Sequence, residues 1–360
     1  MDVLENLTIV IPTYERPLYV SRQISFWCSS DVRVVILDGS PKRYEDERLR
    51  QFKNMSYLHV DGDFHSRMLL AVQEVKTDFV AVLGDDDFFS KDGLRTCINR
   101  LSRDDSIIGC VGRSMRFTYQ NGKIWAEQRD GESSEFSSDT TTGLQRLYET
   151  YHPGKIGALF YGVYRTEIWK SVVQSAYSSR FSTGYIHDTI IRAMLTYRGA
   201  IGVEETLMWF CSAENPPIKS APGMNRKLDL YEWLTSSETV LEREECRRLL
   251  VSYALHHGQD GEEDVGSAID FVLRELQARY AAKAQLRRGI AVRLRVIAMK
   301  LAPTFLKRIV KRWIPTSLRK SVDWTYLELH RAIDSLVDRG VKVSDADVRQ
   351  IAALVHASHS

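Results

Sequence analysis

The sequence is poor in cysteine and has no long apolar run, and each shortage excludes a class of protein. Its five cysteines are scattered, odd in number and form no Cys-x-x-Cys pair. This excludes a disulfide framework and a cysteine-based zinc site, and it favours a reducing compartment. No apolar run approaches the roughly 18 residues that span a bilayer. The first residues carry no basic segment before an apolar core, so no secretory signal is expected either.

The charge of the chain is nearly balanced overall but unevenly distributed. The 360 residues have a formal net charge of +2. The segment from Arg279 to Val322 holds 13 Lys and Arg and no Asp or Glu, which leaves the rest of the chain with a net charge of −11. A solvated surface normally mixes both signs, so this separation indicates a partner for the basic segment.

Four apolar, β-branched runs in the first 90 residues predict the strands of a buried sheet. Between these runs, at 17–28 and 64–75, the apolar residues recur at helical spacing. Strands that are apolar throughout and alternate with helices are typical of a parallel sheet covered on both faces. The strands are expected at 7–14, 32–40, 56–62 and 78–87, followed by helices at 93–102, 142–151 and 187–199 and strands at 107–119 and 204–212.

Carboxylates cluster where two of these strands end. The stretch "FVAVLGDDDFFS" at 79–90 puts Asp85, Asp86 and Asp87 directly after an apolar run, and Asp38 ends the second strand. Ligands of parallel α/β sheets bind beyond the carboxyl ends of the strands, so these carboxylates are expected to converge. A hard divalent cation would offset their repulsion. The alternatives are a solvated turn or a helix cap near Asp92, and an ordinary Asp-Gly-Ser turn after Asp38.

Four stretches in this order resemble the family-2 glycosyltransferases of the GT-A fold. They are "IVIPTYERP", "VVILDGS", "FVAVLGDDDFF" and "GYIHDTIIRAM", and the resemblance covers roughly residues 5 to 215. It implies an α/β fold of the GT-A (Rossmann-like) type, with a mostly parallel sheet flanked by helices. It also implies an inverting transfer from a nucleotide-sugar donor, expected here to be a UDP-sugar, with Mn²⁺ or Mg²⁺ as cofactor.

The resemblance also implies roles for individual residues. Asp188 matches the catalytic base, and Asp86 and Asp87 match the metal ligands, although the choice of ligand among the three adjacent aspartates stays open. Two positions depart from the family pattern, since Gly84 and His187 stand where Asp and Glu are usual. The residues that match nucleotide-sugar contacts are Pro12, Thr13, Tyr14, Glu15, Asp38, Arg67, Asp85 and Asp86.

Several of these residues have a simpler structural interpretation. Asp188 could pair with Arg192 one helical turn later. His187 is interpreted as a surface residue or as a support behind the site rather than as a catalytic group. Arg67 could lie near the diphosphate or on a helix surface, and the aromatic residues of "FYGVYRTEIW" are interpreted as core.

Beyond a loop at 214–223 the chain is expected to be almost wholly helical. This divides it into a catalytic domain at 1–222 and a helical region at 223–360. The basic segment at 279–322 interleaves cations with aliphatic residues, which suits an anionic membrane surface, although it could instead pack on the acidic body. Nucleic-acid binding is not expected, because aromatic residues for base stacking are scarce there. The last two helices, at 323–338 and 344–355, are candidates for a homodimer contact.

The sequence therefore predicts a metal-dependent inverting glycosyltransferase. Its acceptor would be a hydroxyl of a glycan or a lipid-linked acceptor, in the synthesis of a bacterial surface polysaccharide such as O-antigen, capsule or exopolysaccharide. Its location would be cytoplasmic, on the inner face of the cytoplasmic membrane. Two alternatives are a nucleotidyltransferase and a catalytically degenerate membrane-binding scaffold protein.

Overall fold

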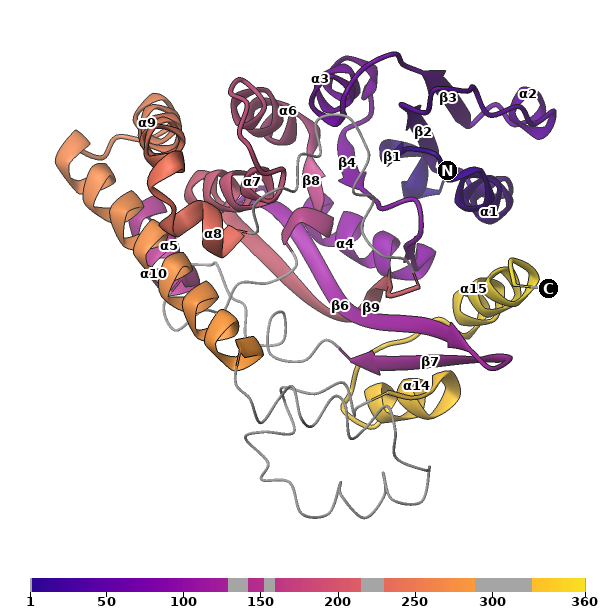
Figure 1. Cartoon of the computed structure of the whole chain (residues 1–360). Coiled ribbons are helices and arrows are strands. Elements are labelled where there is room, and N and C mark those ends of the chain that lie inside the picture. The colour runs from indigo at the N-terminus through magenta and orange to yellow at the C-terminus, as the bar shows by residue number, and fades with distance from the viewer. Residues whose placement is uncertain (1, 129–141, 152–158, 215–229, 289–325, 360) are drawn as a thin grey trace.

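The structure is a computed structural model, and it describes residues 2–128, 142–151, 159–214, 230–288 and 326–359 (Figure 1). One continuous mixed sheet forms its centre. Along the main path the strand order is β10-β7-β6-β8-β4-β1-β2-β3, and β9 pairs with β5 and β6. The predicted α/β fold with helices on both faces is confirmed.

The first half of the sheet is parallel, as its apolar strands predict. The strands β3, β2, β1 and β4 lie side by side in that order, and Thr13 pairs with Asp38 in the register of β1 and β2. The chain therefore leaves neighbouring strands at the same edge of the sheet. The four strands are β1 (Leu7–Thr13), β2 (Arg33–Asp38), β3 (Met55–His59) and β4 (Phe79–Val82).

The second half of the sheet is built around one long strand. That strand, β6, runs parallel to β9 and antiparallel to β7 and β8. Two short strands, β5 and β10, extend the sheet by pairing with β9 and β7. The strands of this half are β5 (Phe88–Phe89), β6 (Ile107–Gln120), β7 (Lys123–Gln128), β8 (Val163–Arg165), β9 (Ala200–Ser212) and β10 (Leu327–Glu328).

Alternate side chains of the parallel strands β1, β2 and β4 enter different cores. Val10 lies in one core with helices α3, α6 and α7, whereas Ile9 and Ile11 lie in the other with α1, α4 and α15. This is the two-residue period of a strand buried on both faces. These helices are α1 (Pro17–Trp27), α3 (Phe64–Glu74), α4 (Lys91–Arg103), α6 (Thr166–Ala176), α7 (Tyr185–Arg198) and α15 (Asp345–Ala357).

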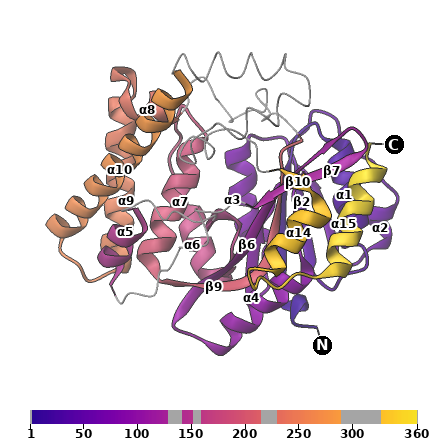
Figure 2. The same cartoon turned by 90° about the horizontal axis from the view of Figure 1, so that it is seen from below.

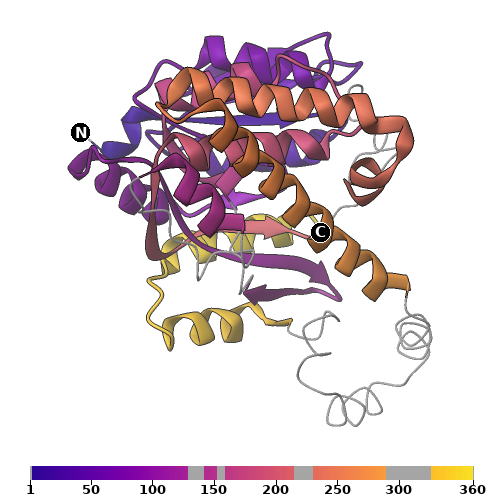
Figure 3. The same cartoon turned by 90° about the vertical axis from the view of Figure 1, so that its left-hand side faces the viewer.

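Further helices form an outer layer on the first core. Helix α9 packs on α6 and α7, and α10 packs on α5 and α9 (Figure 3). A four-residue helix, α2 (Arg48–Gln51), precedes the edge strand β3. The outer helices are α5 (Gly143–Tyr151), α8 (Leu230–Thr235), α9 (Val240–His257) and α10 (Glu262–Arg288), and short 3₁₀ turns lie at Val3–Asn6, Leu159–Tyr161 and Ser237–Thr239.

The last part of the chain returns to the sheet. Helix α14 (Leu329–Val337) packs on β7, and α15 packs on α1 (Figure 2). Lys342 accepts a hydrogen bond from the Leu207 amide at 2.8 Å through its carbonyl oxygen. Within 230–288 and 326–359, the described parts of the C-terminal region, the chain is mostly helical as predicted, and β10 is a two-residue strand. Helices α14 and α15 are the two that were candidates for a homodimer contact, and that contact stays a prediction.

Two predictions for the C-terminal half fall largely outside the described residues. The boundary between 222 and 223 lies in the stretch 215–229, which is outside them. The basic segment is described only as far as the end of α10 at Arg288. Within the part of the chain that the structure describes, no helix is both long enough and apolar enough to cross a membrane. Membrane contact by 289–322 therefore stays a prediction.

Candidate functional site

The carboxylates predicted to converge lie at one edge of the sheet. Strand β4 ends at Val82, earlier than predicted, and Gly84 to Asp87 form a turn in which the Asp87 amide donates to the Gly84 carbonyl at 3.1 Å. The Thr13 hydroxyl donates to Asp85 Oδ2 at 2.7 Å, which joins this turn to the end of β1. Since Thr13 and Asp38 are register partners, the ends of β1, β2 and β4 meet here.

Asp87 is held by two donors from the other half of the sheet. The Trp209 indole N–H donates to its Oδ2 at 3.0 Å, and the Ser212 amide donates to its Oδ1 at 2.7 Å. Both donors come from β9. Burial, and next the charge of Asp86, raise the pKa of Asp87 to about 8. Each oxygen of Asp87 therefore has a protein donor, and the side chain holds the turn against β9.

An arginine that sequence reasoning missed supplies the positive charge in this cluster. Arg16 Nη1 lies 2.7 Å from Asp85 Oδ1 and 3.3 Å from Asp86 Oδ2. Burial raises the pKa of Asp85 to about 6, although the Arg16 charge opposes that shift. The sequence shows Arg16 only as the single cation of the loop "PTYERP". It does not show which way the Arg16 side chain points.

The residues of the turn suit a cation that takes its remaining ligands from a bound molecule or from water. A Cβ on Gly84 would lie 3.0 Å from Asp87 Oδ2 and 3.2 Å from Asp86 Oδ1, so both oxygens border one small space. This also explains Gly84, because an aspartate there would collide with them. The Asp86 side chain is 18% exposed against 5% for Asp85, which makes it the more accessible oxygen donor. Among the described residues no cluster of three His, Cys, Asp or Glu could hold a metal alone.

A cleft of about 480 Å³ opens beside the turn, between the loops that follow β1 and β2. Glu15 and Asp38 line it, as expected of donor-binding residues, and so does Arg16. The Glu15 backbone has a φ of +53° and its N–H donates to Ser40 Oγ at 2.7 Å, which joins the two loops. Thr13 and Tyr14 are buried, and Pro12 is partly buried.

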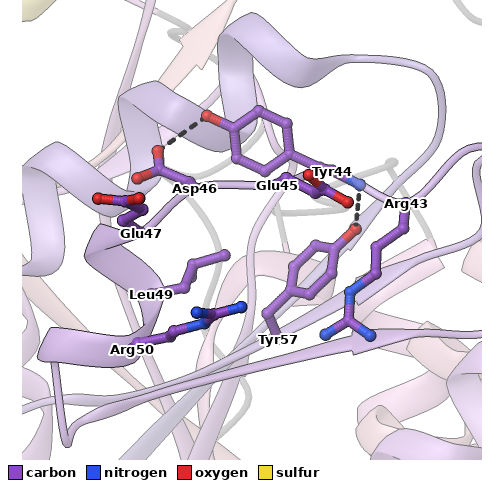
Figure 4. Close-up of a pocket in the computed structure, with 8 residues that line it drawn as sticks. All are labelled: Arg43, Tyr44, Glu45, Asp46, Glu47, Leu49, Arg50 and Tyr57. Atoms are coloured by element: carbon purple, nitrogen blue, oxygen red, sulfur yellow. Dashed lines mark hydrogen bonds between the residues drawn. The ribbon is translucent and has the colours of Figure 1, made fainter.

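Asp38 is fixed at the base of this cleft by its own side-chain bonds. The Ser40 amide donates to Asp38 Oδ1 at 2.8 Å, and the Tyr57 hydroxyl donates to Oδ2 at 2.6 Å. Tyr57 also accepts from the Tyr44 amide at 2.9 Å (Figure 4). A second, wider pocket of about 700 Å³ lies on the other side of the loop that follows β2. Both pockets are lined by Arg43, Tyr44 and Glu45 of that loop.

Arg67 does not lie on a helix surface, so that interpretation is wrong. Its side chain is 1% exposed and donates to the backbone oxygens of Thr13 and Leu37, the latter at 3.3 Å. Burial lowers the pKa of its guanidinium, although the Asp38 charge opposes that shift. A Cβ on Gly39 would lie 2.8 Å from the Arg67 guanidinium carbon. Arg67 thus supports the ends of β1 and β2 from below, and a contact with diphosphate stays a prediction.

Asp188 lies in the first turn of α7 and is partly buried. The Arg192 side chain donates to its backbone oxygen at 3.1 Å. Burial, and then the charges of Asp87 and Asp188, raise the pKa of Tyr161 well above its ordinary value. The Tyr161 ring is stacked on that of Trp209 with centroids 3.9 Å apart. The charges of Asp188 and Asp87 thus both influence Tyr161, although the two aspartates lie on different elements.

His187 is buried, so its interpretation as a surface residue is wrong. Its ring is stacked on Tyr177 with centroids 4.6 Å apart and an interplanar angle of 5°. Its Nε2 lies 3.3 Å from the Ser179 carbonyl oxygen. Burial lowers its pKa to about 4. His187 supports the start of α7 behind Asp188 as a neutral side chain. Tyr164 and Trp169 are core residues, as interpreted above.

The burial of His187 should make the stability of the fold sensitive to acid. A histidine whose pKa falls on folding binds more protons when unfolded, so its stabilisation is present above pH 6.5 and is lost as the pH falls toward 4. Between pH 7.5 and pH 5.0, His187 should account for a loss of about 2 kcal/mol in the free energy of unfolding. Urea unfolding of His187→Phe, which keeps a ring on Tyr177, should show a pH dependence smaller by that amount.

His330→Phe is the matched control, because the His330 side chain is 65% exposed. Its pH dependence should differ from that of the wild type by less than about 0.5 kcal/mol. If the free energy of unfolding of His187→Phe depends on pH as that of the wild type does, His187 is not the buried titrating group.

The chain resembles known proteins as follows. Residues 8–164 match the family model described as glycosyl transferase family 2. Among solved structures, S. aureus TarS 1-349 in complex with UDP-GlcNAc is similar with a TM-score of 0.51 and 15% identity, over 75% of this chain and 72% of that chain. The complex of S. aureus TarS 1-349 with UDP has a TM-score of 0.47 and 15% identity, over 74% and 70% of the two chains. No curated protein matches this chain. The first likeness shows a shared fold.

Proposed function

Because the chain contains a glycosyl transferase family 2 domain at residues 8–164, we propose that it transfers a sugar from a UDP-sugar to an acceptor hydroxyl with inversion of configuration. The observation that carries the proposal is the cleft lined by Asp38 and Glu15, which adjoins the aspartate turn. The TarS structure that shares this fold contains UDP-GlcNAc, which supports UDP as the nucleotide.

The donor would lie across the ends of β1, β2 and β4. Asp38, fixed by Ser40 and Tyr57, would accept hydrogen bonds from the base or the ribose. Asp85 and the loop from Pro12 to Glu15 would enclose the nucleoside. Arg16, which already pairs with Asp85, is close enough to the turn to approach the diphosphate as well.

A divalent cation fits the turn if the diphosphate supplies part of its coordination. Asp86, with Asp87 behind it, would hold Mn²⁺ or Mg²⁺, which would neutralise the charge that develops on the leaving nucleoside diphosphate. Asp87 has its oxygens fixed by Trp209 and Ser212, so it would position the site more than it would bind directly.

Asp188 would take the proton from the acceptor hydroxyl. At the same time the hydroxyl oxygen would form a bond to the anomeric carbon, and the bond between that carbon and the diphosphate oxygen would break. A single displacement of this kind inverts the anomeric configuration. The partly exposed Tyr161, whose ring is stacked on the buried Trp209, would offer an apolar face to a sugar. The acceptor would be a glycan or a lipid-linked acceptor of a bacterial surface polysaccharide, and the basic segment at 279–322 would hold the enzyme on the cytoplasmic membrane face.

The experiment that tests the donor site is a thermal-shift panel of UDP, GDP, CDP and dTDP, each with Mn²⁺ and with EDTA. At a hundredfold excess over its dissociation constant, the correct diphosphate with Mn²⁺ should raise the melting temperature by roughly 5 °C. Asp86→Ala should lose most of that rise, because the cation loses its accessible carboxylate.

Asp264→Ala is the control variant, since Asp264 is an exposed acid in the first turn of α10. It should shift with UDP and Mn²⁺ as the wild type does. If no diphosphate raises the melting temperature at millimolar concentration with Mn²⁺ present, the donor site is refuted and the scaffold alternative is favoured.

A further inference from the structure

The backbone of the aspartate turn is held by side chains of α1, and these are held in turn by the C-terminal end of the chain. Gln23 Nε2 donates to the carbonyl oxygens of Asp85 at 3.0 Å and Asp87 at 2.7 Å. Arg22 Nη2 donates to the carbonyl oxygen of Asp86, between them, at 2.6 Å. The orientation of all three aspartates thus depends on two buried side chains of one helix.

Arg22 is in turn positioned by a buried partner. Its Nη1 lies 3.1 Å from Glu214 Oε2, and the two side chains are 1% and 4% exposed. The Arg22 guanidinium carbon lies 4.6 Å from the ring centroid of Tyr19 and 4.9 Å from that of Phe88. A buried guanidinium without its carboxylate would be strongly unfavourable, so Glu214 determines where Arg22 can lie.

Glu214 is anchored by a residue from the other end of the sequence. His359 Nε2 lies 2.8 Å from Glu214 Oε1, and a carboxylate can only accept, so Nε2 carries the hydrogen. The His359 ring is stacked on Tyr119 of β6 with centroids 4.3 Å apart and an interplanar angle of 3°. His359 therefore has one orientation, and its N–H is directed at Glu214.

Helix α15 is fixed to the same side of the molecule by independent bonds. Asp347 Oδ2 accepts from the Ser90 hydroxyl at 2.7 Å and from the Asp92 amide at 3.2 Å, at the start of α4. Gln350 accepts from Lys91 Nζ at 2.9 Å. These contacts hold α15, and with it His359, on the side of the molecule where Glu214 lies.

We propose that His359, Glu214 and Arg22 are positioning residues for the donor-binding aspartates, so that α15 is a working part of the donor site. The donor-binding half of this inference rests on the proposed function. His359 orients Glu214, Glu214 holds Arg22, and Arg22 fixes the carbonyl of Asp86, the residue assigned to the cation. Loss of His359 should loosen the turn and weaken the part of nucleotide affinity that depends on the cation.

The test compares His359→Ala with His359→Gln, whose amide N–H can still donate to Glu214. His356→Ala is the matched control, because His356 lies edge-on against the same Tyr119 ring. Amide hydrogen exchange of the segment 83–89, measured without nucleotide, should be roughly three- to tenfold faster in His359→Ala only. Calorimetry should show UDP binding weakened by a similar factor with Mn²⁺ and by less than twofold with EDTA.

His359→Gln should restore both quantities to within about twofold, as expected when the donated hydrogen bond is what matters. The inference is overturned if exchange in His359→Ala equals that in His356→Ala, or if UDP affinity falls equally with and without Mn²⁺. Absence of UDP binding in the wild type would instead refute the proposed donor site. The exchange measurement would still decide whether the three residues position the turn.

Discussion

Asp188→Asn should lower the rate of sugar transfer by roughly 10²–10⁴-fold, the usual contribution of a general base. The side chain keeps its size and the first turn of α7 keeps a hydrogen-bonding group, but the amide cannot take the acceptor proton. Binding of UDP with Mn²⁺ should change by less than about twofold, because Asp188 lies in α7 and not among the residues that line the donor cleft. Steady-state kinetics and calorimetry on the same preparation separate these effects.

Asp264→Asn is the comparison variant, since Asp264 also lies in the first turn of a helix but is exposed. Its transfer rate should equal that of the wild type. A fall of less than about fivefold in Asp188→Asn would reject the base assignment. Equal losses in rate and UDP affinity would instead indicate a general disturbance of the site.

Gly93→Ala should lower the free energy of unfolding by about 2–3 kcal/mol, although alanine is the better helix former by about 1 kcal/mol. A Cβ at this position of α4 would lie 2.7 Å from the Met208 Cα and 2.9 Å from the Leu207 carbonyl oxygen. Both are backbone atoms of β9, so no side-chain rotation relieves the collision. Moving β9 would also disturb Trp209, which holds Asp87.

Gly261→Ala provides the control, because the nearest atom to its Cβ would be Asp264 Oδ2 at 3.6 Å. Its stability should be within about 0.5 kcal/mol of the wild type. Denaturant unfolding of both variants is the measurement. If Gly93→Ala is as stable as Gly261→Ala, the close packing of α4 on β9 is not what the structure indicates.

The parallel half of the fold could be predicted because its signal is local. Strands such as Leu7–Thr13 are apolar at nearly every position, and the helices between them have helical spacing. In the other half, the long strands β6 and β9 could also be predicted, at 107–119 and 204–212, but the short strands could not. Strands β5 and β10 have two residues each and exist only because β9 and β7 offer them a partner. No pattern in two residues distinguishes a strand from a turn.

The candidate site shows the same division. The end of β2 at Asp38 could be located from sequence, whereas β4 ends at Val82 rather than at the expected residue 87. The structure brings Asp38 and the aspartate turn to one edge, as predicted. The side-chain partners of these aspartates could not be predicted from sequence, because the donors to Asp87 are 122 and 125 residues away from it. Arg16 and Arg67 illustrate the limit, since the sequence reveals an arginine but not whether it faces solvent, a carboxylate or a carbonyl.

The contact of α15 with α1 has a consequence for the time course of synthesis. Gln350 of α15 donates to the carbonyl of Phe26 across 324 residues of sequence. At the usual elongation rates, roughly 15 to 65 s separate the appearance of these two residues on the ribosome. Throughout that interval the apolar side of α1 has no α15 to cover it, and the nascent chain is open to aggregation or to chaperones. The face of α1 that meets α15 is therefore completed only near the end of synthesis.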